Sequence, residues 1–298
     1  MPLVECRVEM APDAVGVVEG ILGELGASRW VILEDRLAGR AWVVGYFLSR
    51  AAGETAWKKL AAALDPRWLK GTPNLRELRE TEWRNSYRAH FLPWHFGRLH
   101  WVPVWERGSY PIPQRAKVVW LDPGMAFGTG NHETTRLCCE RLIAYAGATE
   151  KTPRWARAAR RVVDAGCGSG ILAISAVRLG FGPVVGFDND PEAVKVSRRN
   201  AAHNGVAGRV QFFRSDLAAG LRGRRAGLIL ANIQAEVLIR HASDLARSVA
   251  PGGQLVLGGI LARELSGVRD AFAALTAGWR AHSRILGEWA DLALTRSY

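Results

Sequence analysis

Cysteine is scarce in this 298-residue sequence: the four cysteines stand at positions 6, 138, 139 and 167, with no C-x-x-C pair or other paired spacing. A disulfide-stapled secreted scaffold and a thiolate metal site both need paired cysteines. The sequence therefore argues against both, and we expect reduced cysteines that pack in the interior of a cytoplasmic protein.

Long apolar runs are also missing. No segment approaches the roughly 18 apolar residues that a membrane-spanning helix requires, and the first residues lack a basic stretch followed by an apolar one, so no secretory signal is expected. Acidic residues are few, 28 against 40 lysines and arginines, which gives a net charge of +12. Two interpretations stay open: arginines on solvated faces, or contact with RNA or a ribonucleoprotein.

Residues 81–117 are rich in tryptophan and contain His90, His95 and His100. Histidines five residues apart share no helical face, and no thiol or close carboxylate accompanies them, so we expect no metal site here. The aromatic side chains are expected to pack a connector between two domains rather than to stack on bases.

The most informative stretch is 162–174, where an apolar run leads into the spacing G-x-G-x-G and a second apolar run. This pattern predicts a buried strand, a tight turn and a helix, with Gly166 and Gly168 allowing the backbone to approach a ligand. A further apolar run, 184–187, ends in Asp188, whose carboxylate can accept hydrogen bonds from two ribose hydroxyls. Together these features predict a nucleoside cofactor.

The spacing of the glycines distinguishes a dinucleotide cofactor from other nucleoside cofactors. Dinucleotide enzymes use G-x-G-x-x-G and aim a helix N-terminus at a pyrophosphate. Here Asp164 stands two residues before the first glycine, and its charge would oppose a pyrophosphate but suit an amino acid with a sulfonium cation. The pattern resembles motif I of the class I S-adenosylmethionine-dependent methyltransferases, and a nicotinamide enzyme is the alternative.

The order of predicted elements indicates two domains and a connector. Residues 1–80 follow a β-α-β-β-α-β order typical of a ferredoxin-like α+β domain, residues 81–117 form the connector, and residues 118–298 alternate between strand and helix. This alternation predicts an α/β, doubly wound Rossmann-like sheet that begins at strand 118–121 and ends in an antiparallel hairpin. The expected helices include 12–25, 133–146, 170–179, 191–204 and 236–248, and the expected strands include 75–79, 184–188, 210–213, 228–231 and 254–257.

A long glycine-rich loop restricts the choice of protein family. A phosphate-binding P-loop needs Lys and Ser or Thr after its last glycine, whereas Asn131 and His132 follow Gly130. Residues 122–135 contain D-P-G-x-A-F-G-T-G-x-H-x-T-T, which, with motif I and Leu230–Ile233, resembles the ribosomal protein L11 methyltransferase family (PrmA). The resemblance is strong over 80–298 and rests on predicted topology alone over 1–80.

This resemblance implies S-adenosylmethionine as the cofactor and assigns a role to each matching position. Asp188 binds the ribose, Phe127 closes over the cofactor, Asp216 contacts adenine by analogy with class I enzymes, and Asn232 lies near the transferred methyl group, where it positions the substrate amine. Thr135 could instead be an ordinary helix residue and Phe127 a core residue. The expected cofactor-binding residues are Phe127, Thr135, Gly166, Gly168, Asp188, Asp216 and Asn232.

The implied activity is methylation of lysine, and possibly α-amino, groups of ribosomal protein L11, held by the N-terminal domain. Two departures from the family, Gln234 and the arginine-rich insertion at 151–160, bear on substrate detail. An Asn-Pro-Pro-Tyr sequence, typical of enzymes that methylate adenine or glutamine, is missing at Asn232–Ala235. Lysine methylation of another protein, or a non-catalytic ribosome- or RNA-binding module, are the alternatives.

Overall fold

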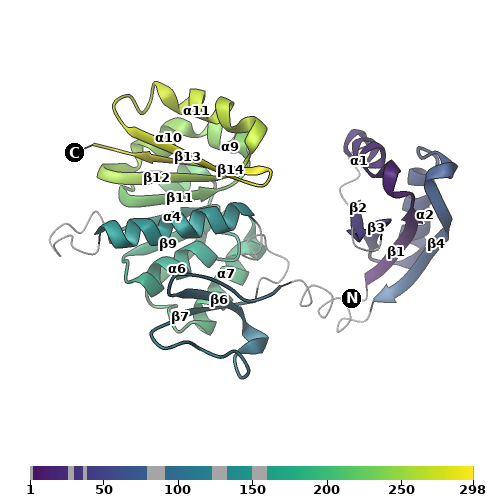
Figure 1. Ribbon diagram of the computed structural model, residues 1–298, viewed down its shortest axis with the longest axis horizontal. Helices are drawn as coiled ribbons and strands as arrows, with labels where there is room; N and C mark the ends of the chain where they lie inside the picture. The colour runs from purple at the N-terminus through teal and green to yellow at the C-terminus, as the bar shows by residue number, and fades with distance from the viewer. Residues whose placement is uncertain are drawn as a thin grey trace. The chain divides into compact units, whose positions relative to one another are not determined.

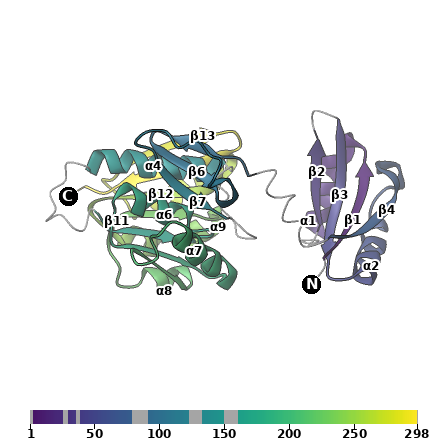
Figure 2. The same cartoon turned by 90° about the horizontal axis from the view of Figure 1, so that it is seen from below.

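The computed structural model describes residues 3–25, 30–35, 39–78, 91–122, 133–149 and 160–297. The chain divides into two compact units, Met1–His90 and Phe91–Tyr298 (Figures 1 and 2). Within the described residues, no helix is both long and apolar enough to cross a membrane.

The first unit is an antiparallel sheet of order β2-β3-β1-β4 with two helices. Buried side chains of both helices, such as Val18 and Leu60, pack with Val8 and Val43 of the central strands in one core. The β-α-β-β-α-β order is the expected one, but the last strand begins six residues earlier than predicted, because it continues beyond an irregularity in its pairing with β1 until Leu69 pairs with Met10. The elements are β1 (Leu3–Met10), α1 (Val15–Glu24), β2 (Trp30–Asp35), β3 (Arg40–Phe47), α2 (Arg50–Ala61) and β4 (Leu69–Leu78).

The second unit is built on a seven-stranded sheet. Its strands are β8 (Val162–Ala165), β9 (Val184–Asp188), β10 (Val210–Arg214), β11 (Ala226–Asn232), β12 (Val249–Leu261), β13 (Arg280–Leu286) and β14 (Trp289–Thr295). Their order is β10-β9-β8-β11-β12-β14-β13. The first five run parallel, and β14 is antiparallel to both of its neighbours. The predicted doubly wound sheet with a terminal hairpin is thereby confirmed.

Helices cover both faces of this sheet (Figure 1). Alternate residues of each strand enter opposite cores: Leu228 and Leu230 face one, Ile229 and Ala231 the other. A strand buried on both faces is continuously apolar, which is why these strands were visible in the sequence. One face carries α4 (Glu133–Thr149), α6 (Ile171–Leu179) and α7 (Pro191–His203), and the other α8 (Leu217–Leu221), α9 (Ala235–Arg240), α10 (Ala242–Arg247) and α11 (Leu265–Ala273).

Several details of the second unit differ from prediction. The expected helix 236–248 is two helices, with His241 between them in a non-helical conformation. The strand expected at 254–257 extends over all of β12, and α8 was not predicted. The expected first strand of the large sheet, 118–121, lies instead in β7 (Lys117–Leu121), which belongs to a separate sheet of order β5-β6-β7.

That small sheet accounts for most of the predicted connector. Residues 91–117 form β5 (Trp94–Phe96), β6 (Leu99–Pro103) and the start of β7, within the second unit, while 81–90 lie outside the described residues. Trp101 is fully buried, stacks on Trp94 with ring centroids 3.9 Å apart, and donates a 2.8 Å hydrogen bond from Nε1 to Ser175 Oγ of α6. These tryptophans therefore serve packing.

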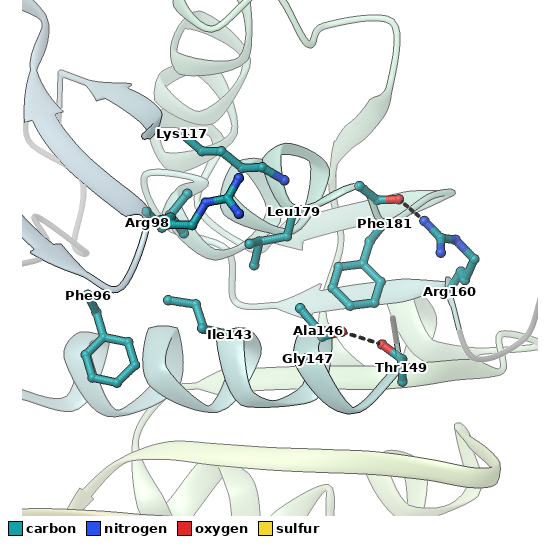
Figure 3. A pocket seen from close by; sticks show the side chains of 12 residues that line it. Phe96, Arg98, Lys117, Ile143, Ala146, Gly147, Thr149, Arg160, Leu179 and Phe181 are labelled. Atoms are coloured by element: carbon teal, nitrogen blue, oxygen red, sulfur yellow. Dashed lines mark hydrogen bonds between the residues drawn. The ribbon is translucent and has the colours of Figure 1, made fainter. Parts of the chain in front are cut away.

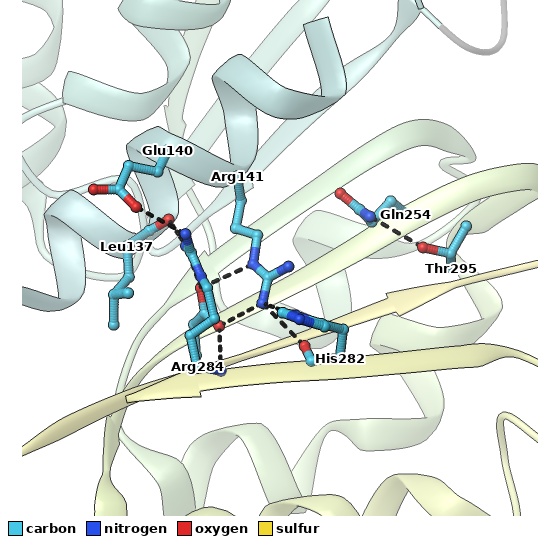
Figure 4. Close-up of polar contacts among 8 residues, drawn as sticks. Leu137, Glu140, Arg141, Gln254, His282, Arg284 and Thr295 are labelled. Carbon is cyan, nitrogen blue, oxygen red and sulfur yellow. Dashed lines mark hydrogen bonds and ion pairs between the residues drawn. The ribbon is translucent and has the colours of Figure 1, made fainter. Parts of the chain in front are cut away.

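A buried carboxylate fastens α4 to the terminal hairpin (Figure 4). Asp291 of β14 is fully buried and accepts hydrogen bonds from Arg141 of α4 at 2.7 and 2.9 Å. Arg284 of β13 donates to the same carboxylate at 2.6 and 3.0 Å, and also to Glu140 Oε2 and the Leu137 carbonyl of α4, each at 2.7 Å. Two cations thus balance one buried anion, and the hairpin and the helix cannot separate without exposing or unpairing it.

We predict that Asp291→Ala lowers the free energy of unfolding by about 3–5 kcal/mol, because it leaves the partly buried guanidinium of Arg141 without its anion and that of Arg284 with Glu140 alone. Denaturant titration of the whole chain measures the change. Asp270→Ala, which removes an exposed carboxylate of α11, is the control and should change stability by less than about 0.5 kcal/mol. Equal effects of the two substitutions would contradict the assigned role of Asp291.

Candidate active site

The order of the strands locates the candidate site. From β8 the chain winds outward through β9 and β10, then returns to place β11 on the other side of β8. In open α/β sheets, ligands bind outside the carboxyl ends of the strands at such a reversal. The residues that follow β8, β9, β10 and β11 at this edge include Gly166, Asp188, Asp216 and Asn232.

The turn after β8 has a conformation that requires glycine. Gly166 and Gly168 have φ values of +75° and +51°, and a Cβ on Gly166 would lie 2.3 Å from Cγ2 of Ile233. The N–H groups of Gly166 and Cys167 both donate to the Phe187 carbonyl, at 2.9 and 3.0 Å. The turn is therefore tied to the end of β9 and leaves room only for backbone.

Asp188 lies half-buried at the tip of β9. Its Oδ2 accepts a 2.9 Å hydrogen bond from Gly168 N, and its Oδ1 accepts one of 3.0 Å from Asp190 N. Each carboxylate oxygen has a second lone pair, so Asp188 can shape the glycine turn and still accept two hydroxyl groups. Asp190 and Pro191 form the cap and first residue of α7.

Asn232 is held by two threonines at the start of α4. The Thr134 hydroxyl donates to Asn232 Oδ1, and Asn232 Nδ2 donates to Thr135 Oγ1 at 3.3 Å. Gly259 N of β12 donates to Thr134 Oγ1 at 3.0 Å. The structure thus brings the expected residues Thr135 and Asn232 together. It adds Thr134, which sequence reasoning passed over although the paired threonines of the loop pointed to both.

Asp164 lies beneath the glycine turn and is almost fully buried. Its Oδ2 accepts a 3.0 Å hydrogen bond from Ala173 N of α6, and its Oδ1 has no partner in the described part of the chain. Burial raises the pKa of this carboxyl from 3.8 to about 7, against the lowering effect of the Ala173 hydrogen bond, and the charge of Asp188 adds to the rise. A cation placed at this site would favour the ionised form of Asp164.

The remaining expected residues differ in their placement. Asp216 is exposed and caps α8, with Oδ1 accepting a 2.8 Å hydrogen bond from Ala219 N. Its contact with adenine stays a prediction. Gln234 is exposed and begins α9 through its backbone carbonyl. Phe127 and His132 lie outside the described residues.

A buried asparagine that the sequence did not single out joins two segments of the site. Asn200 of α7 accepts a 2.9 Å hydrogen bond from Asp122 N at the end of β7, and donates one of 2.9 Å to the Ser169 carbonyl of the glycine turn. Nothing in the local pattern of α7 distinguishes Asn200 from a solvated polar residue, because its partners lie 78 and 31 residues away.

These residues fit S-adenosylmethionine. The glycine turn is a cradle that a Cβ would fill, Asp188 retains lone pairs for a ribose, and Asp164 offers a buried carboxylate oxygen without a described partner to a cationic ligand. A parallel sheet of this strand order with these groups at its carboxyl edge defines a class I, S-adenosylmethionine-dependent methyltransferase.

Comparison with known proteins specifies the family. The family model described as ribosomal protein L11 methyltransferase (PrmA) matches residues 4–297, and the chain belongs to this family. It is 36% identical over 286 residues to the ribosomal protein L11 methyltransferase of Azotobacter vinelandii, covering 91% of this chain and 92% of that protein. It is 45% identical over 221 residues to that of Geobacter metallireducens, covering 74% and 68%.

Comparison with a solved structure supports the same family. The ribosomal protein L11 methylase of Lactobacillus delbrueckii subsp. bulgaricus superposes with a TM-score of 0.58 at 30% identity, covering 68% of this chain and 97% of that one. The family predicted from the glycine-rich loop and motif I is therefore confirmed.

The raised pKa of Asp164 predicts a pH-dependent stability. Between about pH 4 and 7 the folded state keeps a proton that the unfolded state releases, so the free energy of unfolding should fall as pH rises, by up to about 1.4 kcal/mol per pH unit. Asp164→Asn keeps an acceptor for Ala173 N but cannot ionise. Relative to the wild type, it should therefore be more stabilising at pH 8 than at pH 5.

Denaturant titrations of the cofactor-free chain at several pH values test this difference. Asp190→Asn changes an exposed carboxylate in the same region and should keep the pH dependence of the wild type. If Asp164→Asn also keeps it, Asp164 is ionised in the folded protein and the argument from burial fails.

Proposed function

We propose that this chain transfers methyl groups from S-adenosylmethionine to lysine side chains, and to the α-amino group, of ribosomal protein L11. The observation that carries the proposal is the family match over residues 4–297, shared with relatives named for this activity. The site geometry supports it, because the residues at the carboxyl edge of the sheet suit a nucleoside that bears a cation.

The bound cofactor supplies a methyl group on a sulfonium, and the described residues account for how it is held. We assign the ribose to Asp188 and the methionine moiety to the backbone of Gly166 and Gly168. Thr135 and Asn232 are hydrogen-bonded to each other and lie on the β11 side of the glycine turn. The adenine is assigned to the neighbourhood of Asp216, which follows the strand next to β9.

The substrate amine must present a lone pair. A lysine with a pKa of about 10.4 is mostly protonated at neutral pH, and entry into an apolar site lowers its pKa by desolvation. Asn232 Oδ1 already accepts the Thr134 hydroxyl and has one lone pair left. Because the amide is fixed by both threonines, that lone pair points in a set direction, and we propose that it aims the amine. Orientation of this kind can supply several kcal/mol.

The N-terminal unit, the net charge and the cysteines support three further assignments. Residues 1–80 are proposed to hold the protein substrate, as the family resemblance implies. The net charge of +12 supports contact with RNA or the ribosome. The cytoplasm is the proposed compartment, since all four cysteines are unpaired and buried.

Methyl transfer is tested by incubating the full chain with S-adenosylmethionine and unmethylated ribosomal protein L11, and then measuring intact mass. We expect increases in steps of one methyl group. Gly166→Arg should abolish them, because any side chain at Gly166 meets Ile233. Gly208→Arg is the control, since a Cβ there meets nothing within 4 Å. An unchanged mass with the wild-type chain, cofactor binding being demonstrated separately, would contradict L11 as the substrate.

The ribose assignment predicts that Asp188→Ala lowers the affinity for S-adenosylmethionine about 100-fold or more, because two charge-assisted hydrogen bonds are lost at about 1.5–3 kcal/mol each. Isothermal titration calorimetry measures the change. Asp190→Ala removes the neighbouring carboxylate and should cost about 1 kcal/mol of stability through the lost helix cap, with nearly wild-type affinity. Equal losses of affinity in the two variants would refute the assignment.

A further inference from the structure

A cavity of about 400 Å³ lies at the opposite end of α4 and α6 from the candidate active site (Figure 3). It is bounded by the last turns of both helices, by β5 to β7, and by Arg160, which precedes β8. At a rise of 1.5 Å per residue, Thr134 and Thr149 are about 22 Å apart along α4. A ligand in this cavity therefore leaves the methyl-transfer site accessible.

Three cationic side chains line the cavity: Arg98, Lys117 and Arg160. Arg98 lies in the turn between β5 and β6, and Lys117 begins β7. A 2.7 Å hydrogen bond from Lys117 N to Arg98 O joins them, and both side chains extend over the cavity floor (Figure 3). Arg160 donates to the Gly180 carbonyl at the end of α6. None of the described residues that line the cavity is acidic.

The helix ends do not cancel this charge. A helix C-terminus is equivalent to roughly half a negative charge, and Arg160 is already engaged at the end of α6. Within the described residues, Arg98 donates from Nε to the Arg115 carbonyl, at 3.3 Å. Two cations, Arg98 and Lys117, thus remain close together over one further helix end, that of α4. This arrangement attracts an anion.

The floor of the cavity is apolar. It is formed by Leu99, Ile143, Leu179 and Phe181, and Phe96 stands at the rim with 42% of its surface exposed. Bases of single-stranded RNA stack on aromatic rings and on guanidinium planes, while their phosphates need cations nearby. A rim that combines Phe96, Arg98 and Lys117 meets both needs.

We propose that this cavity binds single-stranded RNA, with the phosphate at Arg98 and Lys117 and a base against Phe96. The inference gives a site to the RNA contact proposed above from net charge, and it is independent of methyl transfer to a protein.

Fluorescence anisotropy with a labelled single-stranded RNA of about 12 nucleotides, titrated at several salt concentrations, tests the charge. The double variant Arg98→Gln/Lys117→Gln should weaken binding about tenfold and make the salt dependence of log K less steep by about 1.4, since each lost phosphate contact contributes about 0.7. The matched control is Lys195→Gln/Arg263→Gln, which removes one exposed lysine and one exposed arginine elsewhere and should retain near-wild-type affinity.

Stacking is tested separately. Phe96→Ala should weaken RNA binding about fivefold or more without changing the salt dependence, because it removes a stacking surface and no charge. The control Ile112→Ala truncates another exposed apolar side chain and should have no effect. Methylation of L11 by all four variants should match the wild type, so a loss of methyl transfer with RNA binding intact would bear on the proposed function alone.

Three results would overturn the proposal. The wild-type chain fails to bind the RNA; the pocket and control double variants lose affinity equally, which would mean that general surface charge is responsible; or an acidic peptide competes as well as unlabelled RNA, which would mean that the cavity accepts anions of another kind.

Discussion

The positions of both ends of α4 depend on the ion pairs of the buried Asp291 carboxylate. It binds Arg141 of that helix and Arg284 of the terminal hairpin, and Arg284 reaches back to Glu140 and Leu137. The two arginines give α4 a fixed place on the sheet. The first turn of the helix can then present its threonines to Asn232, and its last turn can form a wall of the basic cavity.

What the sequence could predict was local or periodic. Continuous apolar runs revealed the parallel strands because alternate side chains fill two cores, and the glycine turn was visible because Gly166 and Gly168 need a left-handed conformation. These features mark two parts of the candidate site, the turn after β8 and the tip of β9. Hydrogen bonds hold these two parts together in the structure.

What it could not predict was set by distant partners. The pattern of β7 is the same whether it joins the large sheet or a small one. In the fold, β7 pairs with β6, packs on α6 and exchanges two hydrogen bonds between Trp120 and Asn204 of the loop after α7. The local sequence pattern does not distinguish Thr134 from Thr135. Only in the fold does Gly259 N, 125 residues away along the chain, donate a hydrogen bond to Thr134. Asp216 could be seen to follow a strand, but not to cap α8, a helix too short to show a periodicity.

Helix α6 has an acidic side chain at its N-terminus and a basic side chain at its C-terminus. Its N-terminus is equivalent to a partial positive charge and its C-terminus to a partial negative one. Asp164 accepts Ala173 N at the first end, and Arg160 donates to Gly180 at the second. Arg160 carries more charge than the helix end it offsets, so an excess of positive charge remains beside the cavity. At the other end, the Asp188 carboxylate lies against the glycine turn, and a cation placed there would favour the ionised form of Asp164. The two ends of one helix thus suit ligands of opposite sign, which agrees with a sulfonium cofactor at the carboxyl edge of the sheet and with the phosphate proposed for the cavity.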